Sequence, residues 1–151
     1  MLYLPVADLP ALEADPDVAA LWFADGDPVD LGHAWHGLHV LLNGSAWGGS
    51  APLFDAILGG TPLGDPTSYE PIRFVAPADV KAVAAALPPA ADLISRFTHA
   101  KMKQVEAYPE QRWSEPNVLT AFLLPAYDVL RSVFESAAEA GQAVLITLDR
   151  E

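Results

Sequence analysis

The chain has 151 residues and no cysteine. Without thiols it forms no disulfide, offers no thiolate to a metal ion and has no cysteine nucleophile. Its first residues also lack the basic segment and the unbroken apolar core of a signal peptide. From these absences we expect a cytoplasmic protein.

Basic side chains are missing from residues 1–72, although this half holds ten of the 20 acidic residues and the whole chain has a net charge of −12. An acidic surface repels phosphate backbones and anionic lipids, so nucleic acid and membranes are not expected as partners. The natural complement is a basic protein, which we expect Asp15, Asp17, Asp25 and Asp27 to attract. The alternative is that the acidic residues only keep the protein in solution.

No hydrophobic run is long and uniform enough for a membrane span. The longest uncharged stretch, residues 31–54, is interrupted by histidines, glycines and Asn43. With 52% hydrophobic residues, the chain can still bury a core of ordinary size. We expect one compact domain over residues 1–151.

Hydrophobic periodicity and turn residues predict few strands among many helices. Strands are expected at 2–6, 72–75 and 143–148, and helices at 7–14, 18–24, 31–42, 52–58, 77–87, 90–97, 99–107 and 115–140. The strand at 143–148 is apolar throughout, which favours a central position in the sheet, and Pro125 predicts a kink in the last helix. Without a regular βαβ alternation, the pattern is typical of an α+β domain whose small sheet is covered by several helices.

The helix expected at 31–42 carries three of the four histidines. An apolar stripe runs along positions 31, 34, 35, 38, 41 and 42. His33, His36 and His39, spaced by three, are expected to point away from this stripe. Zinc needs three or four protein ligands or an open water position, and no further ligand cluster lies nearby in sequence. We therefore expect a structural histidine pair, with no metal and no other cofactor.

Motifs for covalent or nucleotide chemistry are also missing. No G-x-S-x-G elbow surrounds a serine, and the glycine segments at 44–49 and 59–64 lack the lysine of a phosphate-binding loop. These segments are expected to be turns, and Asn43-Gly44 and Gly141 are expected to end the helices that precede them. No catalytic residue is identified, and whether the protein is an enzyme stays open at this point.

Two motifs carry a family resemblance: Trp35-His36-x-Leu38-His39-x-Leu41-Leu42, and Ile57-Leu58-Gly59-Gly60-x-Pro62-Leu63. Together with Tyr108-Pro109 and with Ala137-Ala138-x-x-Gly141 near the C-terminus, they make the chain similar to the YfbM-like family of bacterial domains. The resemblance covers nearly the whole chain. It implies a compact, single-domain α+β architecture and implies no reaction.

A cleft of aromatic, histidine and arginine side chains is the other candidate site. The residues proposed for it are Trp35, His36, His39, Tyr69, Arg73, Arg112 and Trp113. Aromatic rings would bury a ligand and arginines would orient an anionic group. The alternative is that Trp35 belongs to the core and Trp113 anchors the long helix.

Acidity without a catalytic grouping favours a non-catalytic binding or protein-interaction domain. Such a domain would bind and neutralise a basic partner protein, as an immunity protein does. The alternative is a small-molecule enzyme or ligand-binding protein that uses His36 and His39 in the cleft. The sequence leaves the oligomeric state open.

Overall fold

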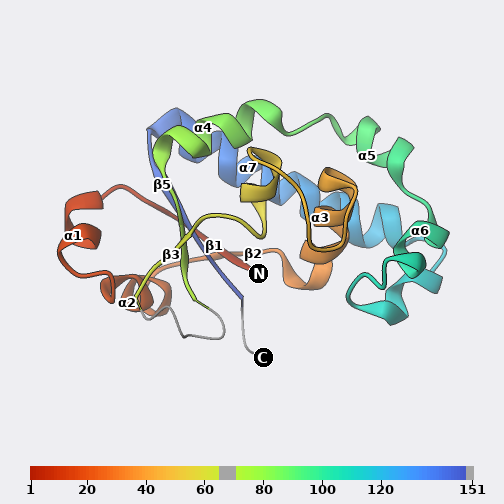
Figure 1. The fold of residues 1–151 in the computed structure, drawn as a ribbon, viewed down its shortest axis with the longest axis horizontal. Helices are drawn as coiled ribbons and strands as arrows, with labels where there is room; N and C mark the ends of the chain where they lie inside the picture. The colour runs from red at the N-terminus through yellow and green to blue at the C-terminus, as the bar shows by residue number, and fades with distance from the viewer. Residues whose placement is uncertain (65–70, 149–151) are drawn as a thin grey trace.

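The computed structural model describes residues 1–64 and 71–148. Within these residues the strands form one antiparallel sheet of five strands in the order β2-β1-β5-β4-β3 (Figure 1). The strands are β1 (Leu2–Val6), β2 (Val29–Asp30), β3 (Thr61–Pro62), β4 (Arg73–Val75) and β5 (Ala143–Thr147). The sheet is therefore small, as expected for the α+β class.

Strand β5 occupies the middle of the sheet. It pairs with β1 on one side and β4 on the other, so that Leu145 lies opposite both Leu4 and Phe74. Its side chains from Ala143 to Ile146 are fully buried. Because side chains alternate along a strand, Leu145 faces one hydrophobic core and Ile146 the other. The expectation of a central strand buried on both faces is confirmed.

Helices cover both faces of the sheet, but unequally. The α-helices are α1 (Leu9–Ala14), α2 (Val18–Asp25), α3 (Trp35–Asn43), α4 (Pro77–Ala86), α5 (Ala90–Arg96), α6 (His99–Gln104) and α7 (Leu124–Ala140). The α7 helix packs against α4, β1 and β5 over the larger core. The α1 and α2 helices cover the smaller core, and they form one end of the molecule, away from α5 and α6 (Figure 1).

The last helix differs from the single kinked helix expected at 115–140. A 3₁₀ turn at Glu110–Ser114 is followed by a π-helical turn at Leu119–Leu123 and then by α7. Proline has no N–H to offer to the carbonyl four residues earlier, so an α-helix cannot run unchanged through Pro125. The wider turn, in which the Leu124 N–H donates to the Leu119 carbonyl, precedes this proline.

Three shorter segments also depart from expectation. The helix expected at 52–58 is one 3₁₀ turn at Leu53–Ala56, and Gly59 and Gly60 follow after two further residues. Strands β2 and β3 lie in segments expected to be irregular, and two residues are too few to show an alternating pattern. Among the described residues, no helix has the length and apolar character needed to cross a membrane.

Candidate functional site: an aromatic cleft

The α3 helix is fixed at both ends by local signals. Before it, the Asp30 carboxylate accepts a hydrogen bond from the Gly32 N–H (2.8 Å), where a 3₁₀ turn at Gly32–Ala34 begins and leads into the helix. Asp30 thus braces the turn that leads into the helix, whereas Leu31 and Ala34, at the N-caps of the turn and of α3, make no side-chain capping hydrogen bond. At the other end, Gly44 adopts a left-handed conformation (φ 72°) and donates its N–H to the Val40 carbonyl (2.7 Å). This is the stop that Asn43-Gly44 predicts.

The sequence pattern places the histidines away from the apolar stripe of the helix, and the structure shows that this side is not exposed on α3. His36 and His39 are fully buried, and only His33 is exposed. The loop at residues 44–50 covers His36 and His39, and Trp113 packs against Gly37. A Cβ atom placed on Gly37 would lie only 2.6 Å from Trp113 Cη2, so glycine allows this close packing. Periodicity within α3 could not reveal partners that come from other parts of the chain.

His36 connects two segments that are far apart in sequence. Its Nε2 lies 2.7 Å from the Ala46 carbonyl oxygen, and its Nδ1 accepts a hydrogen bond from the Tyr108 N–H at 2.8 Å. A backbone N–H only donates and a carbonyl only accepts, so these partners assign the neutral ring with the proton on Nε2. Burial lowers the pKa of His36, which favours the same neutral form.

His39 holds the same loop one residue beyond Trp47. Its Nε2 lies 2.9 Å from the Gly48 carbonyl oxygen, and its Nδ1 faces the Asn43 side-chain nitrogen at 3.3 Å. Burial lowers the pKa of His39, and the nearby His36 lowers it further. The carbonyl groups on the two sides of Trp47 are thus each held by one histidine. This arrangement is what a structural histidine pair requires.

The nitrogen atoms of both rings have partners within the protein. In the described parts of the chain, no three histidine, aspartate or glutamate side chains come together as a metal-binding group. The absence of a bound metal remains a prediction, which elemental analysis can test.

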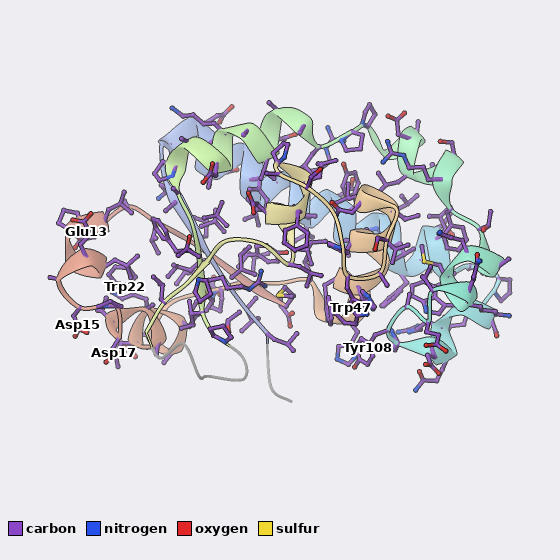
Figure 2. All side chains as sticks on the ribbon, in the orientation of Figure 1. Glu13, Asp15, Asp17, Trp22, Trp47 and Tyr108 are labelled. Carbon is purple, nitrogen blue, oxygen red and sulfur yellow. The ribbon has the colours of Figure 1, made fainter. Side chains whose placement is uncertain are left out.

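Three aromatic rings meet above this pair. Trp35 is 8% exposed and lies between two exposed rings, with centroid distances of 6.4 Å to Trp47 and 6.0 Å to Tyr108. The His36 ring stacks against Trp35 at 5.1 Å and lies 4.3 Å from Trp47. Trp47 and Tyr108 remain 63% and 44% exposed and lie close together in Figure 2.

These rings line a cavity of about 500 Å³, which we call the aromatic cleft. Its walls are Met1, Asp30, Gly32, His33, Trp35, Trp47, Tyr108 and Leu148. A neighbouring hollow of about 420 Å³ shares four of these residues and extends to Leu58, Pro71 and Arg73. The size of the cleft is within the usual range for ligand sites, roughly 300–1,000 Å³.

Charged groups of both signs border the cleft. The Asp30 side chain is 54% exposed, and its Oδ1 lies 3.7 Å from the Met1 amino nitrogen. Arg73 donates from Nη1 to the Gly59 carbonyl and from Nη2 to the Ile57 carbonyl (2.7 Å). Burial lowers the pKa of Arg73. Arg73 therefore braces the backbone of its neighbours, while Asp30 presents charge to solvent.

The structure assembles only part of the cleft that the sequence suggested. Trp35 lines it and His36 supports its rings, while Arg73 lines the neighbouring hollow. His39 lies beneath the loop and does not line the cavity. Tyr69 lies outside the described residues.

Arg112 and Trp113 are not part of the cleft. Arg112 pairs with Glu115 (3.0 Å) and covers the Phe122 ring, with 4.4 Å between the guanidinium carbon and the ring centroid. Trp113 is 1% exposed and donates its Nε1–H to the Ala107 carbonyl. The packing alternative therefore holds for Trp113, because its indole fills the space beside Gly37.

The sequence analysis missed seven of the eight residues that line the cleft: Met1, Asp30, Gly32, His33, Trp47, Tyr108 and Leu148. Trp47 had a usable signal, because a tryptophan in a glycine-rich loop has no periodic partner in a core. Tyr108 had none, since its contact with His36 spans 72 residues of sequence.

The four aspartates proposed to attract a partner lie elsewhere. Asp15, Asp17, Asp25 and Asp27 are all exposed, at or beside the ends of α1 and α2. In Figure 2, Asp15 and Asp17 lie at one end of the molecule, well separated from Trp47 and Tyr108. We call this region the acidic end.

Comparison with solved structures shows that the fold has been seen before. The chain is similar to a protein of unknown function, YfbM from Escherichia coli, with 18% sequence identity and a TM-score of 0.71; the match covers 98% of this chain and 100% of that one. No curated protein matches the chain. A family model described as a domain of unknown function (DUF1877) matches residues 11–147. This match spans most of the chain, which therefore belongs to the DUF1877 family.

Proposed function

We propose that the chain is a non-catalytic binding domain, a single unit over residues 1–151, that recognises a basic partner protein through the aromatic cleft. The observation that carries this proposal is the exposure of Trp47 and Tyr108 at the mouth of a cavity. Tryptophan and tyrosine are the residues most often found at the energetic centre of protein interfaces. Two such rings beside a third, Trp35, supply a large contact area in one place.

The rings are positioned before any partner arrives. His36 and His39 hold the carbonyl groups on both sides of Trp47, and His36 also accepts the Tyr108 N–H. A loop fixed in this way loses little conformational entropy on binding, which favours affinity. In this proposal the histidine pair has a structural role, because it holds the interaction surface in place.

Charge supports a basic partner. Residues 1–72 carry ten acidic and no basic side chains, and Asp30 brings one of these charges to the cleft itself. Such a field raises the encounter rate with positively charged surfaces and repels nucleic acid. A cytoplasmic location fits a chain without cysteine.

The second candidate is a small-molecule binding protein, which the volume of the cleft, about 500 Å³, favours. An enzyme working through His36 and His39 is less well supported. A general base must reach its substrate with a free nitrogen, whereas both rings are engaged with the backbone and with Asn43.

Capture from lysate with matched baits tests the proposal. The baits are the unaltered chain, Trp47→Ala, and Ile94→Ala, which truncates another exposed hydrophobic side chain on α5. We expect the unaltered chain and Ile94→Ala to retain the same basic protein, and Trp47→Ala to lose it. Once that protein is identified and purified, calorimetry must show that the unaltered chain and Ile94→Ala bind it more tightly than Trp47→Ala does. Equal retention by all three baits, or retention of no basic protein, would contradict the proposal.

A further inference from the structure

The arrangement of the three rings indicates what kind of group the cleft attracts. Trp35 lies between the two exposed rings, and the planes of Trp47 and Tyr108 are tilted from it by 54° and 32°. Aromatic faces carry negative electrostatic potential. A cation near several of them is attracted by each, and more strongly where water is partly excluded. The buried Trp35 between two exposed rings provides such a place.

Fixed charges around the cleft also favour a cation. Asp30 lies at its wall with a 54% exposed side chain. The Met1 amino nitrogen lies 3.7 Å from Asp30 Oδ1 and 3.3 Å from the Gly32 carbonyl oxygen. Because this amino group offsets part of the Asp30 charge, the ring faces must supply most of the attraction and Asp30 mainly orients the ligand. An anionic ligand would meet a protein with a net charge of −12.

We infer that the aromatic cleft binds the guanidinium group of an arginine side chain presented by the partner protein, an inference that rests on the proposed function. Guanidinium is planar and weakly hydrated, so it stacks on indole and phenol rings at a low desolvation cost. Its paired N–H donors also match a carboxylate such as Asp30. A lysine ammonium is compact and strongly hydrated, and it gains less from the same rings.

Short peptides provide the direct test. A blocked Gly-Arg-Gly peptide is titrated into the unaltered chain, and binding is followed by NMR through the Trp47 indole and Tyr108 ring signals. The control peptide contains citrulline, which has nearly the same shape as arginine and no charge. We expect the arginine peptide to bind with a Kd on the order of 1 mM, and the citrulline and lysine peptides to bind about tenfold more weakly.

Variants locate the interaction. Trp47→Ala should weaken binding of the arginine peptide about tenfold, whereas Trp47→Phe keeps a ring face and should retain most of it. Asp30→Asn should weaken binding about threefold, since its amide oxygen can still accept the Gly32 N–H while the charge is lost. Ile94→Ala should have no effect.

Three other results would contradict the guanidinium inference. Citrulline binding as tightly as arginine would show that charge is not recognised, and lysine binding equally would remove the preference for guanidinium. Tighter binding of free L-arginine than of the blocked peptide would identify a small molecule, and not a protein side chain, as the ligand. If Trp47→Ala lowers the thermal midpoint, the citrulline comparison on the unaltered chain decides.

The two proposals can fail separately. If the arginine peptide fails while a basic protein is still captured in a Trp47-dependent manner, the guanidinium inference is wrong and the binding function stands. If the peptide binds but no basic protein is captured, the cleft keeps its ligand class and the protein-interaction function is wrong.

Discussion

The acidic end and the aromatic cleft are built in opposite ways. Asp15, Asp17, Asp25 and Asp27 belong to one short stretch of chain, and all of them are exposed. The cleft combines residues from positions 30–47 with Met1, Leu148 and Tyr108, and the Tyr108 N–H donates a hydrogen bond to His36 across 72 residues of sequence. Local composition is enough to recognise the first region. The second exists only when the chain is folded, so a sequence pattern cannot reveal it.

The two regions also rest on different cores. The α1 and α2 helices cover a small cluster whose fully buried members are few, including Leu145, whereas the cleft lies beside α3 over the larger core. If the proposed function holds, charge at the acidic end acts on the partner at long range, while the cleft acts through rings held at fixed distances. Substitutions that affect one region and spare the other can separate their contributions to stability and to partner binding.

The largest effect is expected where both regions share support, at β5. Leu145→Asp would place an unpaired charge in a strand that is fully buried. The desolvation cost is several kcal/mol against a total stability of about 5–15 kcal/mol, so the variant should not fold and both regions should be lost together. Circular dichroism during thermal unfolding measures this.

Leu145→Met, which nearly conserves volume, is the control and should cost less than about 1.5 kcal/mol. A thermal midpoint of Leu145→Asp within a few degrees of the parent would mean that β5 tolerates water, contrary to its central position.

Removing the histidines should disrupt the cleft and spare the acidic end. His36→Ala leaves the Ala46 carbonyl and the Tyr108 N–H without their partner and opens a cavity, for an expected loss of about 2–4 kcal/mol; His39→Ala should cost somewhat less. NMR should show shifts in Trp47 and Tyr108 but not in α1 and α2. The exposed His33→Ala is the matched control and should cost under about 0.5 kcal/mol.

The same variants test the expectation that the protein binds no metal at the histidine pair. Elemental analysis of chelator-treated protein should find no stoichiometric transition metal. Zinc that is retained by the unaltered chain and lost in the His36→Ala, His39→Ala double variant would overturn the structural interpretation of the pair.

Acid should weaken the cleft in a defined pH window. Burial lowers the pKa of both His36 and His39 below the ordinary value of 6.5. Above about pH 6.5 the rings are neutral in the folded and the unfolded chain, and their contribution to stability is complete. As the pH falls below that value, the unfolded chain takes up protons first. The free energy of unfolding then drops by at most about 1.4 kcal/mol per pH unit for each histidine, until the folded rings also protonate.

Urea unfolding between about pH 7.5 and 5.5 measures how the free energy of unfolding changes with pH. This dependence should be weaker in the double variant His36→Gln, His39→Gln. It should persist in the control His33→Asn, because His33 is exposed beside Tyr108. The Trp47 signal of the folded protein should change only at lower pH, where His36 itself is protonated and can no longer accept the Tyr108 N–H. An unchanged slope in the double variant would assign the pH dependence to other groups.

How much of the fold the sequence predicts depends on how far apart in sequence the contacting residues lie. Strand β1, central β5 and the stops at Gly44 and Gly141 follow from local patterns and are confirmed. The two-residue strands and the π turn before Pro125 depend on neighbours that no short window contains.

The candidate site divides in the same manner. The histidine pair stood out by its spacing, but its role depends on carbonyls of a loop and on Tyr108, which periodicity on α3 cannot indicate. Trp113 appeared to be a site residue only because the sequence does not show that its indole fills the space beside Gly37.

The smallest effect on stability, and the sharpest test of the comparison, is expected from neutralising the acidic end. Asp15, Asp17, Asp25 and Asp27 changed together to asparagine should alter stability by no more than about 0.5 kcal/mol per site, because all four are exposed and asparagine can still accept the Asp17 N–H at position 15. If these charges steer a basic partner, the association rate with the captured protein should fall several-fold, and its salt dependence should become weaker. The reason is screening, since the Debye length shortens from about 10 Å at 0.1 M salt to about 3 Å at 1 M. Trp47→Ala should instead raise the dissociation rate and leave the salt dependence intact. Stopped-flow or surface-based kinetics across this salt range separates the two regions: an association rate that is flat with salt and unchanged in the fourfold variant would leave the aromatic cleft as the sole recognition surface.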